Sequence, residues 1–216
     1  DTARQLQMSL MPTESPVIDA FDIFGHCIPA DHVGGDFFQY FHHGSKFIVA
    51  IADATGHGMT AAMPVMVFSG VLDSHINLGA ERHDLLDALN SSMCRNLNRR
   101  AFICFAFAQV DLKNHTLTCS NRACPYPYHY SSQTGRIKEL QLDAYALGIK
   151  AEMEYEELTI HLLPGDSVVY YTDGIPEAEN ASGELFGFDR TNETIHRLCT
   201  KGLSAQEIVA GLLETV

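Results

Sequence analysis

Residues 46–58 read KFIVAIADATGHG, and this stretch decides how the chain folds. Residues 47–52 are all apolar, which is typical of a β-strand buried on both faces. The strand ends at Asp53, and a glycine-containing loop follows it. Upstream, residues 37–41 favour a second strand, and residues 42–45 supply a turn. The two runs are therefore predicted to pair as a β-hairpin, with His42 and His43 exposed at its tip.

The order of elements around this hairpin indicates an α+β fold rather than alternating βαβ units. Apolar residues at helical spacing predict helices at 1–10, 59–76, 84–97, 192–199 and 204–213. In the last of these, Ser204 and Glu207 have the spacing of a capping box. Further strands are predicted at 18–28, 102–112, 116–120, 126–130, 137–140, 155–163 and 167–172, the last two joined by a Pro-Gly-Asp turn. We expect a sandwich of two mainly antiparallel sheets flanked by helices.

The composition is that of a globular protein, and it argues against several partners. The 216 residues include 14 Lys and Arg against 27 Asp and Glu, a formal net charge of −13, and 46% are hydrophobic. A chain of this length buries roughly 70% of its unfolded surface in one core. Nucleic acid and anionic membranes attract clustered basic residues, whereas the only tight basic pair here is Arg99–Arg100. Neither nucleic acid nor a membrane is therefore expected as a partner.

The remaining features of the composition indicate a cytoplasmic protein. The six cysteines form no CxxC pair, which favours reduced thiols. The longest apolar stretch, around residues 61–72, is too short to span a bilayer, and no signal peptide begins the chain. Because residue 1 is Asp rather than Met, we expect a piece of a longer protein. Residues 1–11 are then the end of an incoming linker helix, and residues 12–216 are the main domain.

Three aspartates stand out because each lies at an end of a predicted strand beside glycine. They are Asp36 in VGGDF, Asp53 in IADATGHG and Asp173 in YYTDG. A buried charge without a partner is costly, so converging carboxylates need a cation between them. Carboxylates and backbone carbonyls are the ligands that Mg²⁺ and Mn²⁺ prefer. One such aspartate alone is more simply a helix cap or an Asx turn, but three in this context favour a metal site.

Three stretches together resemble a known family. Residues 29–37 (PADHVGGDF), 51–58 (IADATGHG) and 171–178 (YTDGIPEA) are similar to the motifs of the metal-dependent serine/threonine protein phosphatases of the 2C type, the PPM family. They are more similar still to the bacterial branch typified by SpoIIE and RsbU. Residues 7–12 (QMSLMP), 61–63 (AAM) and 163–166 (LPGD) fit that branch as well. The resemblance extends over about residues 3 to 190.

The resemblance implies an αββα sandwich with two divalent cations, Mn²⁺ or Mg²⁺, in its cleft. Carried over residue by residue, Asp53 would bridge both metals, and Asp36 would hold one of them. Ala54 would offer its backbone carbonyl, and Asp173 would hold the other metal. Asp36 and Asp53 would thereby be the catalytic residues. The reaction implied is direct attack of a metal-activated water on phosphorus, without a phosphoenzyme.

The chain departs from the family pattern in two places. The branch usually ends in an Asp-Asp-x-Thr segment on a final strand, whereas this chain ends at Val216 on a predicted helix. We therefore expect the fold to lack its last strand, through truncation at the C-terminus or by nature. The family's Asn-Ala-Gly-His turn reads Asn121-Arg122-Ala123-Cys124 here, so its histidine is absent.

Other candidate site residues have a structural interpretation of equal or greater weight. His57, between two glycines, is either a proton carrier or a residue that fixes its loop. Glu177 and Glu179 follow Asp173, and they either orient metal-bound water or belong to a solvated loop. The sequence contains no GxSxG elbow and no phosphate-binding P-loop.

These observations predict hydrolysis of phosphoserine or phosphothreonine on a protein. By resemblance, that protein is an anti-sigma-factor antagonist of the STAS type in a bacterial partner-switching pathway. The incoming helix is expected to connect to a sensor or receiver domain, and it could form a homodimer. One alternative is a PPM-fold binding module with weak or no activity, and another is a hydrolase of small phosphoesters.

Overall fold

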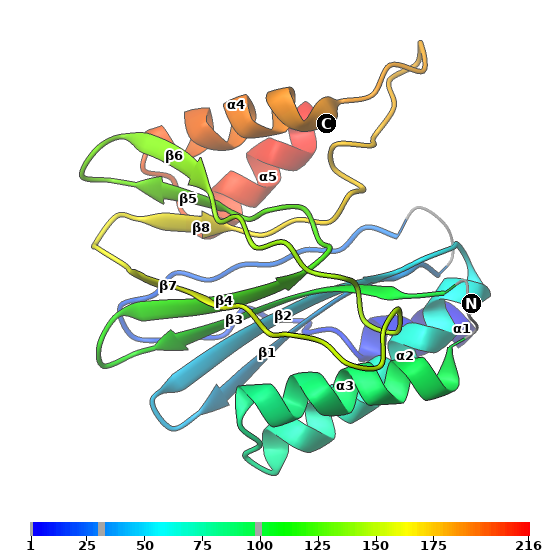
Figure 1. The fold of residues 1–216 in the computed structure, drawn as a ribbon. Coiled ribbons are helices and arrows are strands. Elements are labelled where there is room, and N and C mark those ends of the chain that lie inside the picture. Colours follow the sequence, from blue (N-terminus) through cyan, green and yellow to red (C-terminus); the bar gives the residue numbers. More distant parts are fainter. Residues whose placement is uncertain (1, 30–32, 98–100) are drawn as a thin grey trace. The chain divides into compact units, whose positions relative to one another are not determined.

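The computed structural model describes residues 2–29, 33–97 and 101–216, and these form two compact units (Figure 1). The first unit contains residues 1–13, 27–124 and 142–160. The second contains residues 14–26, 125–141 and 161–216. Residues 30–32 of the 29–37 motif and the basic pair Arg99–Arg100 lie outside the described residues. The chain thus crosses between the two units several times.

The sheet of the first unit is built on the predicted hairpin. Its strands lie in the order β1-β2-β3-β4-β7. The strands are β1 (Asp36–His43), β2 (Lys46–Ala54), β3 (Ile103–Asp111), β4 (Thr116–Arg122) and β7 (Leu158–His161). β1 and β2 are antiparallel, with His43 opposite Lys46, so the connecting loop is Gly44 and Ser45. Gly44 has φ 59°, which a tight hairpin turn requires. His42 and His43 are exposed, as predicted, but they belong to β1.

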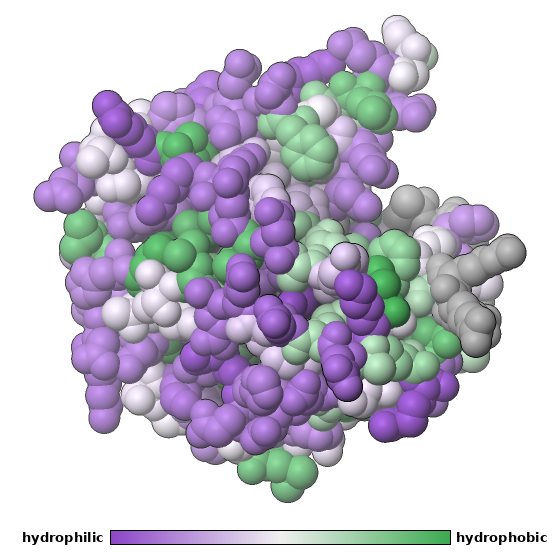
Figure 2. Space-filling view, viewed as in Figure 1, coloured by the Kyte–Doolittle hydropathy of each residue, from purple (hydrophilic) through white to green (hydrophobic). Residues whose placement is uncertain are grey.

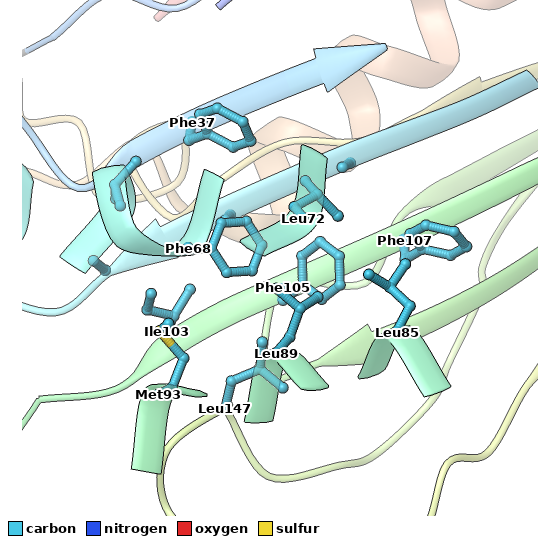
Figure 3. Close-up of a cluster of buried hydrophobic side chains, with 14 of the residues drawn as sticks. Phe37, Phe68, Leu72, Leu85, Leu89, Met93, Ile103, Phe105, Phe107 and Leu147 are labelled. Carbon is cyan, nitrogen blue, oxygen red and sulfur yellow. The ribbon is translucent and has the colours of Figure 1, made fainter. Parts of the chain in front are cut away.

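Helices cover one face of this sheet (Figure 1). They are α2 (Met59–Asn77) and α3 (Arg82–Asn96), while the short α1 (Thr2–Ser9) begins the chain. Phe68 of α2 makes edge contacts with Phe37 at 5.9 Å and with Phe105 at 5.0 Å between ring centroids. Figure 3 shows these rings pointing toward one another between sheet and helices. This apolar layer fixes the β1–β2 hairpin, and with it Asp36 and Asp53, against α2.

α2 is the one helix among the described residues long and apolar enough, by length and composition alone, to cross a membrane. Its buried side chains include Val65, Phe68 and Leu72, which belong to the core of the first unit. Pro64 is the sixth residue of α2 and has no N–H to donate to the carbonyl of Thr60, so one helix hydrogen bond is absent there. The apolar character of α2 is therefore that of a core helix.

The second unit has its own sheet and its own helices. The sheet has the order β6-β5-β8, with β5 (Tyr128–Ser131), β6 (Arg136–Glu139) and β8 (Ser167–Val169) all antiparallel. Side chains from α4 (Gly187–Thr200) and α5 (Ala205–Thr215) complete its core. The capping box of Ser204 and Glu207 is confirmed, since each side chain contacts the other's backbone N–H. α4 begins five residues before the predicted start, because its exposed first turn gives no apolar periodicity.

The predicted strand at 18–28 is wrong. Only an isolated bridge joins Ile18 to Phe21, and the rest of the segment is irregular. Ala20 has φ 64°, so the chain turns back on itself there. Asp22 then accepts a hydrogen bond from the backbone N–H of Ala205 at 2.6 Å, at the start of α5. The alternating pattern thus reflects a segment that turns and caps a helix.

Two later strands are shorter than predicted. The strand expected at 155–163 is β7, residues Leu158–His161, and that expected at 167–172 is β8, which ends at Val169. Asp173 consequently lies in a turn rather than directly at a strand end.

A buried His–Asp pair connects β5 to the turn before β8. His129 Nε2 lies 3.1 Å from Asp166 Oδ2, and the two side chains are 8% and 3% exposed. Asp166 also accepts hydrogen bonds from the backbone N–H groups of Ser132 and Leu163, at 2.8 and 3.2 Å. Burial by itself would raise the pKa of the Asp166 carboxyl, but these hydrogen bonds outweigh burial and lower it. The ionised carboxylate is therefore part of the folded state.

We expect the substitution Asp166→Asn to lower the free energy of unfolding at pH 7 by roughly 2 kcal/mol, because it weakens several hydrogen bonds to a charged group. A lowered pKa stabilises the fold above about pH 4, and this contribution is lost as the pH falls through the folded-state value. The difference in the free energy of unfolding between wild type and variant should therefore be smaller at acid pH. Urea unfolding at neutral and acid pH measures it, with the exposed Asp19→Asn as control. A gap that does not change with pH would contradict this account.

Candidate metal centre

Asp36 and Asp53 face each other across the β1–β2 hairpin. Their backbones are direct partners in the antiparallel register, and both residues are half-buried. Like charges directly opposite on neighbouring strands destabilise a sheet unless something neutralises them. The negative charge of Asp36 also affects its surroundings: burial raises the pKa of the Cys27 thiol to about 12, and Asp36 adds to that effect. The register thus brings two carboxylate residues together on neighbouring strands.

The backbone at Gly35 lies unusually close to Asp53 and Ala54. A Cβ atom at Gly35 would lie 2.2 Å from the carbonyl oxygen of Ala54 and 2.7 Å from Asp53 Oδ1. The backbone N–H of Ala54 donates to the carbonyl of Gly35 at 3.0 Å. Only glycine fits here, because any side chain would occupy the space beside the Ala54 carbonyl and the Asp53 carboxylate. The oxygen-only set of Asp36, Asp53 and Ala54 fits a hard divalent cation.

The loop after β2 is held in place at both ends. The backbone N–H of Thr55 donates to the carbonyl of Phe102 at 3.1 Å, and the N–H of Phe102 donates to Thr55 Oγ1 at 3.1 Å. The carbonyl of His57 accepts a hydrogen bond from Thr60 Oγ1 at 2.8 Å, at the start of α2. His57 itself is exposed. Its backbone fixes the loop, while a role for its ring in proton transfer stays a prediction.

Gln7 is a residue of this region that sequence reasoning missed. It lies on α1 and is 2% exposed. Its Nε2 donates to the carbonyl of Gly34 at 2.7 Å, and its Oε1 accepts from the N–H of Gly34 at 3.0 Å. A weaker contact joins Nε2 to the carbonyl of Asp36 at 3.4 Å. A buried glutamine at an otherwise apolar helix position is the signal that could have identified it.

Asp173 belongs to the second unit, in a turn after β8. It is exposed, and its carbonyl accepts a hydrogen bond from the N–H of Glu177 at 2.9 Å. Within residues 2–29, 33–97 and 101–216, no three or more His, Cys, Asp or Glu side chains gather closely enough to hold a metal ion. The roles of Asp36, Asp53, the Ala54 carbonyl and Asp173 as metal ligands therefore all stay predictions.

The turn at residues 121–124, which corresponds to the family's Asn-Ala-Gly-His motif, is held by two hydrogen bonds. Asn121 Nδ2 donates to the carbonyl of Cys124 at 2.9 Å, and the N–H of Cys124 donates to Asn121 Oδ1 at 3.1 Å. Ala123 adopts φ 62° between them. Asn121 and Cys124 are both buried. The asparagine thus shapes the turn even though the histidine is replaced.

Comparison with known proteins places the chain among phosphatase relatives. Residues 43–216 match the family described as Stage II sporulation protein E (SpoIIE). The chain is 26% identical over 216 residues to the phosphoserine phosphatase RsbU of Bacillus subtilis (strain 168). That match covers all of this chain and 64% of RsbU, so the chain spans less than two thirds of this relative.

Solved structures share the fold. The SiaA-PP2C domain of Pseudomonas aeruginosa superposes with a TM-score of 0.81 at 22% identity, covering 99% of this chain and 85% of that domain. RsbX, solved in complex with magnesium, superposes with a TM-score of 0.64 at 16% identity, covering 90% of this chain and 83% of RsbX. The expected fold class, two antiparallel sheets flanked by helices as in PPM phosphatases, is confirmed. Since the SpoIIE match extends over most of its length, the chain belongs to the SpoIIE family.

Proposed function

We propose that the chain is a metal-dependent phosphatase that removes phosphate from phosphoserine or phosphothreonine on a protein. The observation that carries this proposal is the pairing of Asp36 with Asp53 around the close approach of Gly35 to Ala54. The similarity to RsbU, a phosphoserine phosphatase, supports the substrate class. Mg²⁺ or Mn²⁺ is the proposed cofactor, and the magnesium complex of RsbX is consistent with it.

In this proposal the chain's own residues would hold two divalent cations. Asp53 would serve both cations, Asp36 and the Ala54 carbonyl would serve one, and Asp173 would serve the other. Two bound divalent cations would lower the pKa of a water and neutralise charge that builds up on the phosphoryl group. The rigid β1–β2 hairpin keeps Asp36 and Asp53 in place, so little reorganisation is needed during reaction. Glu177 and Glu179, both exposed, belong to the loop after Asp173 and are proposed only as groups that orient water.

The finer proposal concerns partners. We place the chain in the cytoplasm, acting on a phosphorylated anti-sigma-factor antagonist of the STAS type. Membership of the SpoIIE family supports this assignment. α1 would be the end of a helix that arrives from a sensor or receiver domain and that could also form a homodimer. Its hydrogen bonds to Gly34 give such a helix a direct contact with the loop before Asp36.

One observation favours a second candidate function, a binding module of the same fold. Cys124 stands where the family pattern has histidine, and it is buried. If that histidine is needed for turnover, the chain would bind a phosphorylated partner and release it unchanged.

Metal removal tests the proposed function. With Mn²⁺ or Mg²⁺ the chain should hydrolyse p-nitrophenyl phosphate, and it should dephosphorylate a phosphorylated STAS protein more efficiently. EDTA should abolish both reactions, because water at neutral pH is a poor nucleophile without the metal, and added Mn²⁺ should restore them. A folded protein inactive on both substrates with every divalent metal would overturn the proposal in favour of the binding module. A strong preference for the small ester would favour the hydrolase of small phosphoesters.

A further inference from the structure

The segment from Asp173 to Phe188 forms an ordered projection of the second unit, which we call the Asp173 hairpin; its last two residues are also the first two of α4. Backbone hydrogen bonds join Phe186 N–H to the Ala178 carbonyl and Gly187 N–H to the Pro176 carbonyl, both at 2.7 Å. At the tip, the side chain of Asn180 accepts from the N–H groups of Ser182 and Glu184 at 2.9 and 3.0 Å. Figure 1 shows the hairpin projecting beyond the N-terminal end of α4. The hairpin is thus an ordered projection with a defined shape.

The Asp173 hairpin carries large apolar side chains in the open. Phe186 is 8% exposed and anchors the base, whereas Leu185 and Phe188 on either side of it are 50% and 54% exposed. Figure 2 shows hydrophobic surface in the region where the hairpin projects. Single exposed apolar residues need no explanation, but two on one fixed projection form a surface suited to another protein.

The charge around these side chains selects the kind of partner. Glu177 and Glu179 are exposed on the same hairpin, and so is Asp173. Glu184 is the one acid with a strong cationic partner there, since its Oε1 lies 2.6 Å from Arg190 Nη2. The hairpin is therefore apolar and acidic, and a complementary surface is apolar and basic.

Resting on the proposed function, we infer that the Asp173 hairpin is the docking element for the phosphoprotein substrate. Leu185 and Phe188 would contact an apolar patch on that protein, and Lys or Arg around the patch would face Glu177 and Glu179. The hairpin starts at Asp173, which the proposed function makes a metal ligand. A protein held by the hairpin would consequently be bound next to Asp173. Small esters would not use this surface.

The test compares two substrates on one variant. In the double variant Leu185→Ser/Phe188→Ser, kcat/KM for a phosphorylated STAS protein should fall at least tenfold, mostly through KM, because a uniform binding contribution is lost. Hydrolysis of p-nitrophenyl phosphate should stay within twofold of wild type. Leu78→Ser removes a side chain that is 81% exposed just after α2, and this control should affect neither substrate.

Two variants of opposite charge at Ala181, at the tip of the Asp173 hairpin, test whether the docking surface is acidic. Ala181 is exposed, so either replacement is accommodated. Ala181→Lys should raise KM for the phosphoprotein several-fold, whereas Ala181→Glu should lower it or leave it unchanged. The same KM for both variants would contradict an acidic docking surface.

The remaining outcomes separate this inference from the proposed function. Equal losses on both substrates, or a lower melting temperature of the double variant, would show that Leu185 and Phe188 stabilise the chain itself, and would overturn the inference. An unchanged double variant would overturn it as well. If wild type has no metal-dependent activity, the proposed function fails. Calorimetric binding of the phosphorylated STAS protein in EDTA then decides the inference, which requires the double variant to bind at least tenfold more weakly.

Discussion

Gly35→Ala is expected to abolish the metal-dependent activity of this chain. The added Cβ would lie 2.2 Å from the Ala54 carbonyl oxygen and 2.7 Å from Asp53 Oδ1. The first of these is backbone in a buried strand, so it moves only if the hairpin itself is distorted. Such overpacking costs about 1–3 kcal/mol of stability. It also displaces two proposed ligands together, so activity should fall by more than about 100-fold.

The neighbouring glycine provides a matched control. Among the described residues, a Cβ at Gly34 would meet only the backbone nitrogen of Asp36, at 4.0 Å. The hydrogen bonds to Gln7 use only backbone atoms of Gly34. Gly34→Ala should therefore keep nearly full activity. Hydrolysis of p-nitrophenyl phosphate across a Mn²⁺ titration, with melting temperatures of both variants, measures the difference. Similar effects of the two substitutions would show that Gly35 has no special relation to the metal centre.

Asp53→Asn should have the second large effect. We expect it to lower the activity but not to lower the stability of the metal-free protein. The amide has nearly the same shape but no charge, so a bridging metal ligand is lost and activity should fall by more than about 100-fold. Without metal, the same change removes the repulsion between Asp36 and Asp53. In EDTA the variant should thus be at least as stable as wild type.

Thermal unfolding with and without Mn²⁺ separates these effects. Wild type should gain stability on adding Mn²⁺, because a ligand that binds only the folded state stabilises it, and the variant should gain much less. Asp73→Asn, at an exposed position of α2, should behave like wild type in both assays. A variant that keeps both its activity and its Mn²⁺-induced stabilisation would remove Asp53 from the metal centre.

Much of this fold could be predicted from local signals. The β1–β2 hairpin follows from an apolar run beside a turn, and the start of α5 follows from Ser204 and Glu207. The strand expected at 18–28 failed because alternation does not show that Ala20 turns the chain, or that Asp22 caps a helix 183 positions away. Contacts that depend on distant segments leave no periodic pattern in the sequence.

In the candidate site, too, local signals identified some residues, whereas contacts with distant segments could not be predicted. Residue types and neighbouring glycines identified Asp36 and Asp53, but only the register shows that they are direct partners. The buried contacts of Gln7 and Arg122 were not predicted, because polar residues at such positions are normally taken as solvated. Arg122 is 1% exposed, donates to the Glu154 carbonyl at 2.8 Å and lies over the Tyr155 ring. Its partners come from an irregular segment about 30 residues later, which periodicity cannot connect to it.

Two hydrogen bonds join Gln7 of α1 to Gly34, so α1 and the residues just before Asp36 should move together. One side-chain amide both donates to and accepts from the same residue, so α1 cannot slide or rotate by an ångström without breaking both bonds. Local fluctuations that release α1 therefore also release the loop that leads into Asp36. The two segments share one opening free energy, so the amide protons of both should show a similar protection factor, that is, a similar slowing relative to each amide's intrinsic exchange rate.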